Sequence, residues 1–138
     1  VLNGVYPFYA KLTYDLDFDH ENMFVKCTSY LNNKKSQKID IIWYSKEQLK
    51  GRDVILIDDL FDTCLTITEV IKEIKKMKPK SLTVVGLIDK PEKHAVKFKP
   101  DYVCFKAGPE FLIGFSLDFN GIMRNLPYIG VPKDELIK

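Results

Sequence analysis

The clearest pattern of hydrophobic and polar positions lies between residues 53 and 90. DVILID (53–58) is a continuous apolar run closed by acids, typical of a strand buried on both faces of a parallel sheet. After the turn LFDTCL, a helix is predicted over roughly 66–77, and SLTVVGLID (81–89) reads as a second buried strand. The helix has one apolar face at 3.6-residue spacing: Ile67, Val70, Ile71, Ile74 and Met77. Strand, helix and strand with short joints predict a βαβ unit.

Local signals mark both ends of this helix. Thr66 and Glu69 have the T-x-x-E spacing of a capping box, and Pro79 ends the helix. The lysines clustered at 72–80 lie opposite the apolar face, so a solvated helix surface explains them better than a nucleic-acid site does.

The flanking segments predict an α/β fold. YPFYAKLTYDL (6–16) suits a helix, and MFVKCTSY (23–30) and KIDIIWY (38–44) suit strands joined by the polar loop NNKKSQ. DYVCF (101–105) predicts another core strand, and GFSLDF (114–119) and YIGV (128–131) predict strands or extended pieces. Alternating elements of this kind indicate α/β architecture. Without repeats or a linker, we expect one domain over residues 1–138.

Composition narrows the class. The chain has 138 residues, 46% hydrophobic and 29% charged, which suits a globular domain with a core. A net charge of +2 is too small to indicate nucleic acid. The three cysteines form no CxxC pair, as expected for reduced thiols, and the two histidines form no ligand motif. No apolar run approaches the roughly 18 residues of a membrane span. We therefore expect a soluble, cytoplasmic protein with no membrane or nucleic-acid partner.

Three acids close together raise the question of function. Asp58, Asp59 and Asp62 end the first buried run, and such carboxylates repel one another unless a positive or hydrogen-bonding partner lies among them. The turn DTCLT (62–66) precedes a helix, so its amides and the helix dipole can cradle a phosphate. The acids then suit sugar hydroxyls or Mg²⁺. Lys90 and Asp118 also follow predicted strands, although each such residue alone is explained as well by a loop cap.

These residues resemble a known family. ILIDDLFDTCLT (55–66) is similar to the phosphoribosyl-pyrophosphate motif of type I phosphoribosyltransferases. The rest of the chain resembles the bacterial hypoxanthine/guanine members in VLNGVYPFYAKL (1–12), TSY (28–30), LIDKPEK (87–93), KPDYVCFKAGPEFLIGFSLDFN (99–120) and RNLPYIGV (124–131). The resemblance implies a mainly parallel twisted sheet flanked by helices. It also implies a mobile flap hairpin at about 28–44 and a purine-binding segment at about 99–138.

The resemblance also implies roles at the sugar and at the leaving group. Asp58 and Asp59 match the acidic pair that binds the ribose hydroxyls, and Asp62 matches the general acid/base at purine N7. The loop around the 5′-phosphate would be Asp62, Thr63, Cys64, Leu65 and Thr66. Pyrophosphate contacts would come from Leu2, Asn3, Gly4, Ser29, Tyr30 and Arg124.

The purine and the metal are assigned in the same way. Lys90 matches the lysine that binds the 6-oxo group, Phe111 the ring that stacks on the base, and Leu112 a backbone contact to its edge. Asp118 matches an acid near Mg²⁺ and pyrophosphate and is grouped with the purine-binding residues. The implied metal-binding carboxylates are Asp118, Asp58 and Asp59. The implied reaction transfers phosphoribose from phosphoribosyl pyrophosphate to hypoxanthine or guanine in purine salvage. Relatives are usually homodimers or homotetramers.

The sequence departs from the family pattern at three positions. Cys64 stands where glycine is usual, Asn3 where lysine is usual, and Asp58 where glutamate is usual. A side chain at a position requiring φ > 0 costs about 1–2 kcal/mol and would crowd the phosphate. We therefore expect a weakened or specialised enzyme. In relatives an apolar strand runs into V-L-x-G, so a shortened N-terminus and an exposed sheet edge are also expected.

Two other classes stay open at this point. A receiver-like signalling domain is also doubly wound and carries acids and a lysine after its strands, but its acids do not form one cluster in the middle of the chain. A non-catalytic relative that binds nucleotide or phosphoribosyl pyrophosphate is compatible with Cys64 and Asn3.

Overall fold

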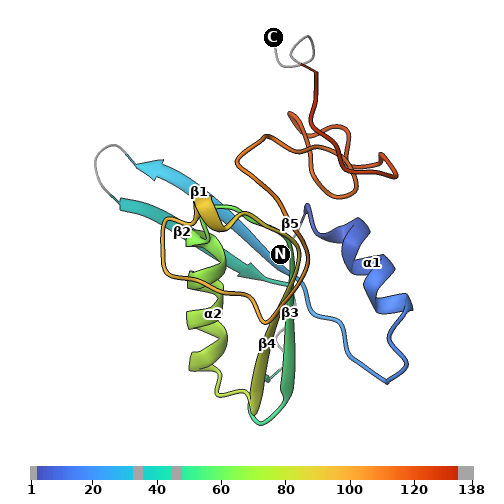
Figure 1. Cartoon of the computed structure of the whole chain (residues 1–138). Coiled ribbons are helices and arrows are strands. Elements are labelled where there is room, and N and C mark those ends of the chain that lie inside the picture. Colours follow the sequence, from blue (N-terminus) through green and yellow to red (C-terminus); the bar gives the residue numbers. More distant parts are fainter. Residues whose placement is uncertain (1–2, 33–35, 45–47, 134–138) are drawn as a thin grey trace.

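The computed structural model describes residues 3–32, 36–44 and 48–133, and the side chains of 29–38 lie outside that description. Within these ranges the α/β prediction is confirmed, and every predicted helix and long strand is present with ends shifted by a few residues (Figure 1). The helices are α1 (Tyr6–Tyr14), α2 (Leu65–Lys76) and the short 3₁₀ helix η1 (Pro91–Lys93). The strands are β1 (Val25–Asn32), β2 (Ser36–Trp43), β3 (Asp53–Phe61), β4 (Ser81–Asp89) and β5 (Tyr102–Lys106).

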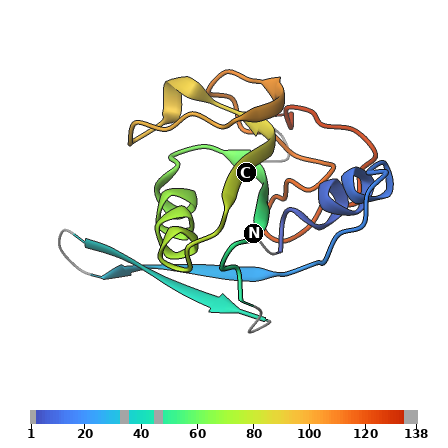
Figure 2. The same cartoon turned by 90° about the horizontal axis from the view of Figure 1, so that it is seen from below.

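The centre of the molecule is a parallel sheet in the order β3-β4-β5. β3 and β4 pair from Asp53↔Ser81 to Phe61↔Asp89, so both end at the same edge of the sheet. Seen from below, α2 lies on one side of this sheet and α1 on the other (Figure 2). The loops that follow β3 and β4 therefore meet at the carboxyl edge, where α/β sheets bind their ligands.

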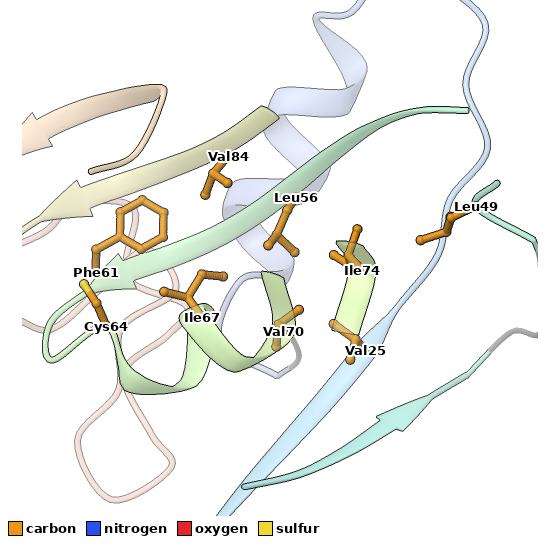
Figure 3. Close-up of a cluster of buried hydrophobic side chains, with 9 residues drawn as sticks. All are labelled: Val25, Leu49, Leu56, Phe61, Cys64, Ile67, Val70, Ile74 and Val84. Carbon is orange, nitrogen blue, oxygen red and sulfur yellow. The ribbon is translucent and has the colours of Figure 1, made fainter. Parts of the chain in front are cut away.

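A core cluster fills the space between the sheet and α2. Ile67, Val70 and Ile74 of α2 are at most 3% exposed, as its helical spacing predicts. Figure 3 shows them facing Leu56 and Phe61 of β3. The polar face of α2 carries ion pairs between Lys72 and Glu69 and between Lys76 and Glu73. The lysine cluster is thus the solvated helix face that was expected.

The predicted capping box is wrong. The helix begins at Leu65 and its N-cap is Cys64, which makes no side-chain cap bond. Thr66 is already the second helical residue, so its hydroxyl cannot cap the first turn. Glu69 pairs with Lys72 instead.

A second cluster lies on the face of the sheet that α1 covers. Val5 and Phe8 pack there with Leu87 and Ile88 of β4 and with Leu117. The N–H of Phe8 donates to Ser116 Oγ at 3.2 Å, which ties α1 to the C-terminal segment. This side of the sheet therefore fixes the position of the C-terminal segment.

The segment after β5 forms bridges rather than regular strands. Within residues 107–133, backbone pairs join Ile113 to Gly130, Gly114 to Leu117 and Phe119 to Ile122. Positive φ angles at Gly114, Phe115 and Ser116 interrupt the extended run predicted at 114–119, and others follow at Asn120, Gly121 and Met123. The piece predicted at 128–131 makes its backbone pair through Gly130. Backbone in the left-handed region cannot continue a strand, so residues 114–123 form a compact loop.

The remaining elements complete the described fold. β1 and β2 form the predicted antiparallel hairpin, with Val25 opposite Trp43. β3 is an edge strand of the three-stranded sheet, and Ile55 on it is 45% exposed. Among the described residues, no helix combines the length and apolarity needed to cross a membrane.

Candidate active site

The loops after β3 and β4 are bonded to one another at the carboxyl edge of the sheet. The N–H of Lys90 donates to Phe61 O at 2.9 Å, and the N–H of Ala95 donates to Thr63 O at 3.0 Å. Because these bonds join the segment after β4 to the turn before α2, Asp62 and Lys90 lie close together at this edge of the sheet. Their roles in one binding site stay a prediction.

The acidic pair of β3 lies in a setting that disfavours two negative charges. The N–H of Asp59 donates to Asp58 Oδ1 at 3.2 Å. Burial, reinforced by the Asp58 carboxylate, raises the pKa of Asp59 to about 7. Burial also raises the pKa of Asp58. A cation or sugar hydroxyls bound here would stabilise the ionised pair.

Gly4 lets a basic residue approach the acidic pair. A Cβ atom built on Gly4 would lie 2.2 Å from Asp59 Oδ2 and 2.9 Å from Arg124 Nη1. The missing side chain therefore brings Asp59 and Arg124 together at the loop before α1. Asp59, predicted to bind ribose, and Arg124, predicted to bind pyrophosphate, both lie next to this glycine.

Arg124 is itself held by the C-terminal segment. Its Nη2 lies 2.5 Å from Asp118 Oδ1, and its Nη1 donates to Ser116 O. Asp118 Oδ2 also accepts from the N–H of Gly121 at 2.7 Å. In this structure Asp118 therefore forms an ion pair with Arg124. The described residues contain no group of three or more histidine, cysteine or acidic side chains placed to hold a metal ion by themselves. The metal roles implied for Asp58, Asp59 and Asp118 stay predictions.

The turn before α2 has a left-handed residue at its centre. Cys64 has φ 62° and ψ 8°, so this position does require the conformation that glycine favours. Its side chain is 5% exposed and lies in the core cluster beside Phe61 and Ile67 (Figure 3). Burial, with the nearby Asp89, Asp62 and Asp58 carboxylates, raises the pKa of the thiol to about 12. The thiol therefore stays protonated and points into the core.

This turn leaves amide groups for an anion. The first backbone bond of the helix runs from Thr68 N to Cys64 O, and no side chain caps the first turn. The N–H groups of residues 65–67 consequently lack helical acceptors, as at every helix N-terminus. Together with the helix dipole, they favour a phosphate at residues 62–66.

Lys90 lies under the segment assigned to the purine. The residue is 2% exposed, and its Nζ donates to Glu110 O at 2.6 Å. Burial lowers the pKa of this lysine. Next to Glu110, Phe111 is 50% exposed and makes an edge contact with Phe119, with ring centroids 6.0 Å apart. Lys90 is thus bonded to the residue that precedes Phe111 in the chain.

Some predicted residues cannot be placed. Leu2 lies outside the described residues, as do the side chains of Ser29 and Tyr30, whose backbone belongs to β1. Asn3 is exposed, and Leu112 is partly buried in the cluster under α1. The roles implied for these residues stay predictions.

Sequence reasoning missed two residues at the site. Lys93 Nζ lies 3.0 Å from Asp62 Oδ2, and His94 Nε2 lies 2.7 Å from Asp89 Oδ1. Both lie within four residues of Lys90, and Lys93 ends the segment LIDKPEK (87–93), so their closeness in sequence to a candidate ligand lysine was the available signal. Lys93 pairs with Asp62 from the turn before α2, and His94 pairs with Asp89 at the end of β4. Sequence spacing alone does not reveal these pairs.

A large cavity lies elsewhere. It has a volume of about 540 Å³ and is lined by the first half of β3, by residues 18–23 and by Leu49 and Trp43. Because Asp53 and Ser81 line it, it opens at the amino ends of the parallel strands. It is therefore distinct from the site at their carboxyl ends.

Comparison with known proteins defines the class. A family model described as a phosphoribosyl transferase domain matches residues 1–120. The chain therefore belongs to the phosphoribosyl transferase family. This result excludes the receiver-like alternative.

Individual relatives narrow the similarity. The hypoxanthine-guanine phosphoribosyltransferase of Lactococcus lactis subsp. lactis is 37% identical over 137 residues, which cover 99% of this chain and 74% of that protein. The protein of the same name from Streptococcus thermophilus is 38% identical over 137 residues, 99% of this chain and 76% of that one. A hypoxanthine phosphoribosyltransferase structure from Staphylococcus aureus superposes with a TM-score of 0.92 at 30% identity, covering 99% of this chain and 75% of that one.

Proposed function

We propose that this chain transfers the phosphoribosyl group of phosphoribosyl pyrophosphate to hypoxanthine or guanine, forming the nucleoside monophosphate and pyrophosphate. The observation that carries the proposal is the meeting of the β3 acids, the turn before α2 and Lys90 at one edge of the sheet. A solved relative supports it: a Trypanosoma cruzi hypoxanthine phosphoribosyltransferase variant in complex with the product IMP superposes with a TM-score of 0.91. The proteins compared above are named as transferases, so the non-catalytic alternative gains no support.

The sugar phosphate would occupy the edge between β3 and α2. The amides of the first turn of α2 bind the 5′-phosphate, because they lack helical acceptors and carry the positive end of the helix dipole. Asp58 and Asp59 accept hydrogen bonds from the ribose hydroxyls. The ribose hydroxyls would then donate hydrogen bonds to two carboxylates, Asp58 and Asp59, whose pKa values are raised in the free protein.

Mg²⁺ fits this site as a cation carried largely by the substrate. The ion usually takes one or two carboxylates together with phosphate oxygens and water, and Asp58 and Asp59 supply such ligands. When bound, it would neutralise negative charge on the pyrophosphate. Arg124 lies near Asp59 across Gly4 and would share that task.

The purine would lie between Lys90 and Phe111. A buried lysine that donates hydrogen bonds favours a 6-oxo base, because the amino group of adenine is itself a donor. Phe111, half exposed, offers a face for stacking. The hydrogen bond from Lys90 to Glu110 O fixes this lysine against the segment that carries the ring.

Asp62 is the proposed proton carrier at purine N7. Its Oδ1 is buried and accepts no hydrogen bond from the described residues, so this oxygen lacks the donor that a buried carboxylate oxygen needs. Departure of the proton from N7 would neutralise the base as its N9 bonds to C1′. Asp62 therefore acts by general base catalysis.

Steady-state turnover of purified protein tests the assignment. We expect pyrophosphate release with hypoxanthine or guanine and little with adenine. Asp62→Asn should lower kcat by about 10²–10⁴-fold, the usual contribution of a general base. Asp17→Asn is the matched control, because Asp17 is exposed and distant in sequence from Asp62. Adenine turnover equal to that of the 6-oxo bases, or an Asp62→Asn variant as active as the control, would contradict the proposal.

The cytoplasmic location and a homodimeric or homotetrameric state remain predictions, which fractionation and light scattering would test.

A further inference from the structure

The two carboxylate oxygens of Asp62 have different surroundings. Oδ2 accepts from Lys93 Nζ at 3.0 Å, whereas Oδ1 is buried without a hydrogen-bond partner among the described residues. A carboxylate whose two oxygens are equivalent can rotate freely about its last bond. Here one oxygen is engaged by a cation, so the other is presented in a fixed direction.

Lys93 is well fixed for this task. It ends η1, whose first residue is Pro91, and its own N–H donates to Lys90 O at 2.9 Å. Two residues further on, the N–H of Ala95 donates to Thr63 O at 3.0 Å. The backbone that carries Lys93 is thus bonded both to the end of β4 and to the turn that carries Asp62.

A buried pair next to Lys93 strengthens this arrangement. His94 Nε2 lies 2.7 Å from Asp89 Oδ1, and the two side chains are only 10% and 6% exposed. The His94 ring also contacts Phe98 edge-on, with centroids 5.8 Å apart. Because its neighbour is anchored in this way, the backbone from which the Lys93 side chain reaches Asp62 is held in place.

The pair between Lys93 and Asp62 is a weak candidate for stabilising the fold. Their side chains are 38% and 34% exposed, and ion pairs this open to solvent contribute little to stability. Orientation is a better explanation, since small misplacements of a catalytic group are costly for rate. We propose that Lys93 is a positioning residue for Asp62, holding Oδ2 so that Oδ1 faces the proton on the purine. This inference rests on the proton-carrier role proposed above for Asp62.

The test compares turnover numbers with Michaelis constants. Lys93→Met should lower kcat with hypoxanthine by about tenfold, a part of the total effect of a general base. The Michaelis constants for base and phosphoribosyl pyrophosphate should stay within about twofold, because no ground-state contact is removed. Lys93→Arg keeps the charge and should recover most of the lost kcat. Lys97→Met, at an exposed position of the same loop, is the control and should behave as the unmodified protein.

A second background separates this inference from the proposed function. In the Asp62→Asn protein, with residual turnover followed at high enzyme concentration, adding Lys93→Met should change kcat by less than about twofold, because the two act as a unit. An equal tenfold loss in both backgrounds, a rise confined to the Michaelis constant for phosphoribosyl pyrophosphate, or no rescue by arginine would overturn the positioning role alone. Full activity of Asp62→Asn itself would overturn the role of Asp62 and this inference with it.

Discussion

Cys64 offers the sharpest test of how the turn before α2 is built. Its backbone is left-handed, with φ 62°, and a side chain in this region costs about 1–2 kcal/mol. The thiol is 5% exposed in the core cluster, and burying a small apolar group of this size offsets about 1–2 kcal/mol. The two terms nearly cancel, which explains how a non-glycine residue is tolerated here.

Two substitutions separate these terms. Cys64→Ala keeps the backbone strain and removes the buried sulfur, whereas Cys64→Gly removes both. We expect the glycine variant to be more stable than the alanine variant by about 1 kcal/mol, because alanine cannot adopt a positive φ without strain. The glycine variant should lie within about 1 kcal/mol of the unmodified protein. Urea unfolding followed by circular dichroism measures both differences, provided that the slopes agree.

The same variants decide whether Cys64 crowds the substrate. Since the side chain points into the core in Figure 3, the Michaelis constant for phosphoribosyl pyrophosphate should stay within about twofold in both variants. A several-fold lower value for Cys64→Gly would revive the expectation that this side chain obstructs the phosphate. An alanine variant more stable than the glycine variant would refute the strain argument.

Three further predictions follow from close contacts and from burial. For Asp59, a pKa raised to about 7 means that the folded protein binds the extra proton, so stability falls as pH rises from about 4 to 7; thermal melts across this range should show a smaller fall for Asp59→Asn, and parallel curves would contradict this. Gly4→Ala places a Cβ 2.2 Å from Asp59 Oδ2 and should reduce kcat/KM by at least about tenfold, with an unchanged melting temperature. Unchanged kinetics would show that the close approach of Gly4 to Asp59 does not matter for activity. Gly86→Ala places a Cβ 2.1 Å from the Phe61 ring and should destabilise the fold by about 1–3 kcal/mol in urea; a variant as stable as the parent would mean that the ring moves aside freely.

Predictions from the sequence were correct where the hydrophobic pattern of a single segment is enough to identify a helix or strand. The run DVILID, the apolar face of α2 and the run SLTVVGLID each identify an element without reference to the rest of the chain. The acids at 58, 59 and 62 and Lys90 could be assigned to one site for a related reason. In a parallel sheet, the ends of neighbouring strands share an edge.

Predictions failed where the backbone departs from regular geometry. Thr66 has the sequence signature of a cap, but the left-handed Cys64 begins the helix earlier and displaces it. The segment at 114–119 was predicted as a strand or extended piece, yet positive φ angles at Gly114, Phe115 and Ser116 fold it into a loop. Such angles depend on contacts made with the rest of the chain, which sequence spacing does not encode.

The sequence by itself determined the α/β class, the location of the acidic cluster and the resemblance to a phosphoribosyltransferase, because hydrophobic periodicity and short motifs are local properties. Only the tertiary structure decided which groups face one another: Lys93 with Asp62, His94 with Asp89, and Gly4 between Asp59 and Arg124. Those pairs join segments that meet only when the sheet forms. Their distances, and the raised pKa of Asp59, are consequences of packing that no single segment contains.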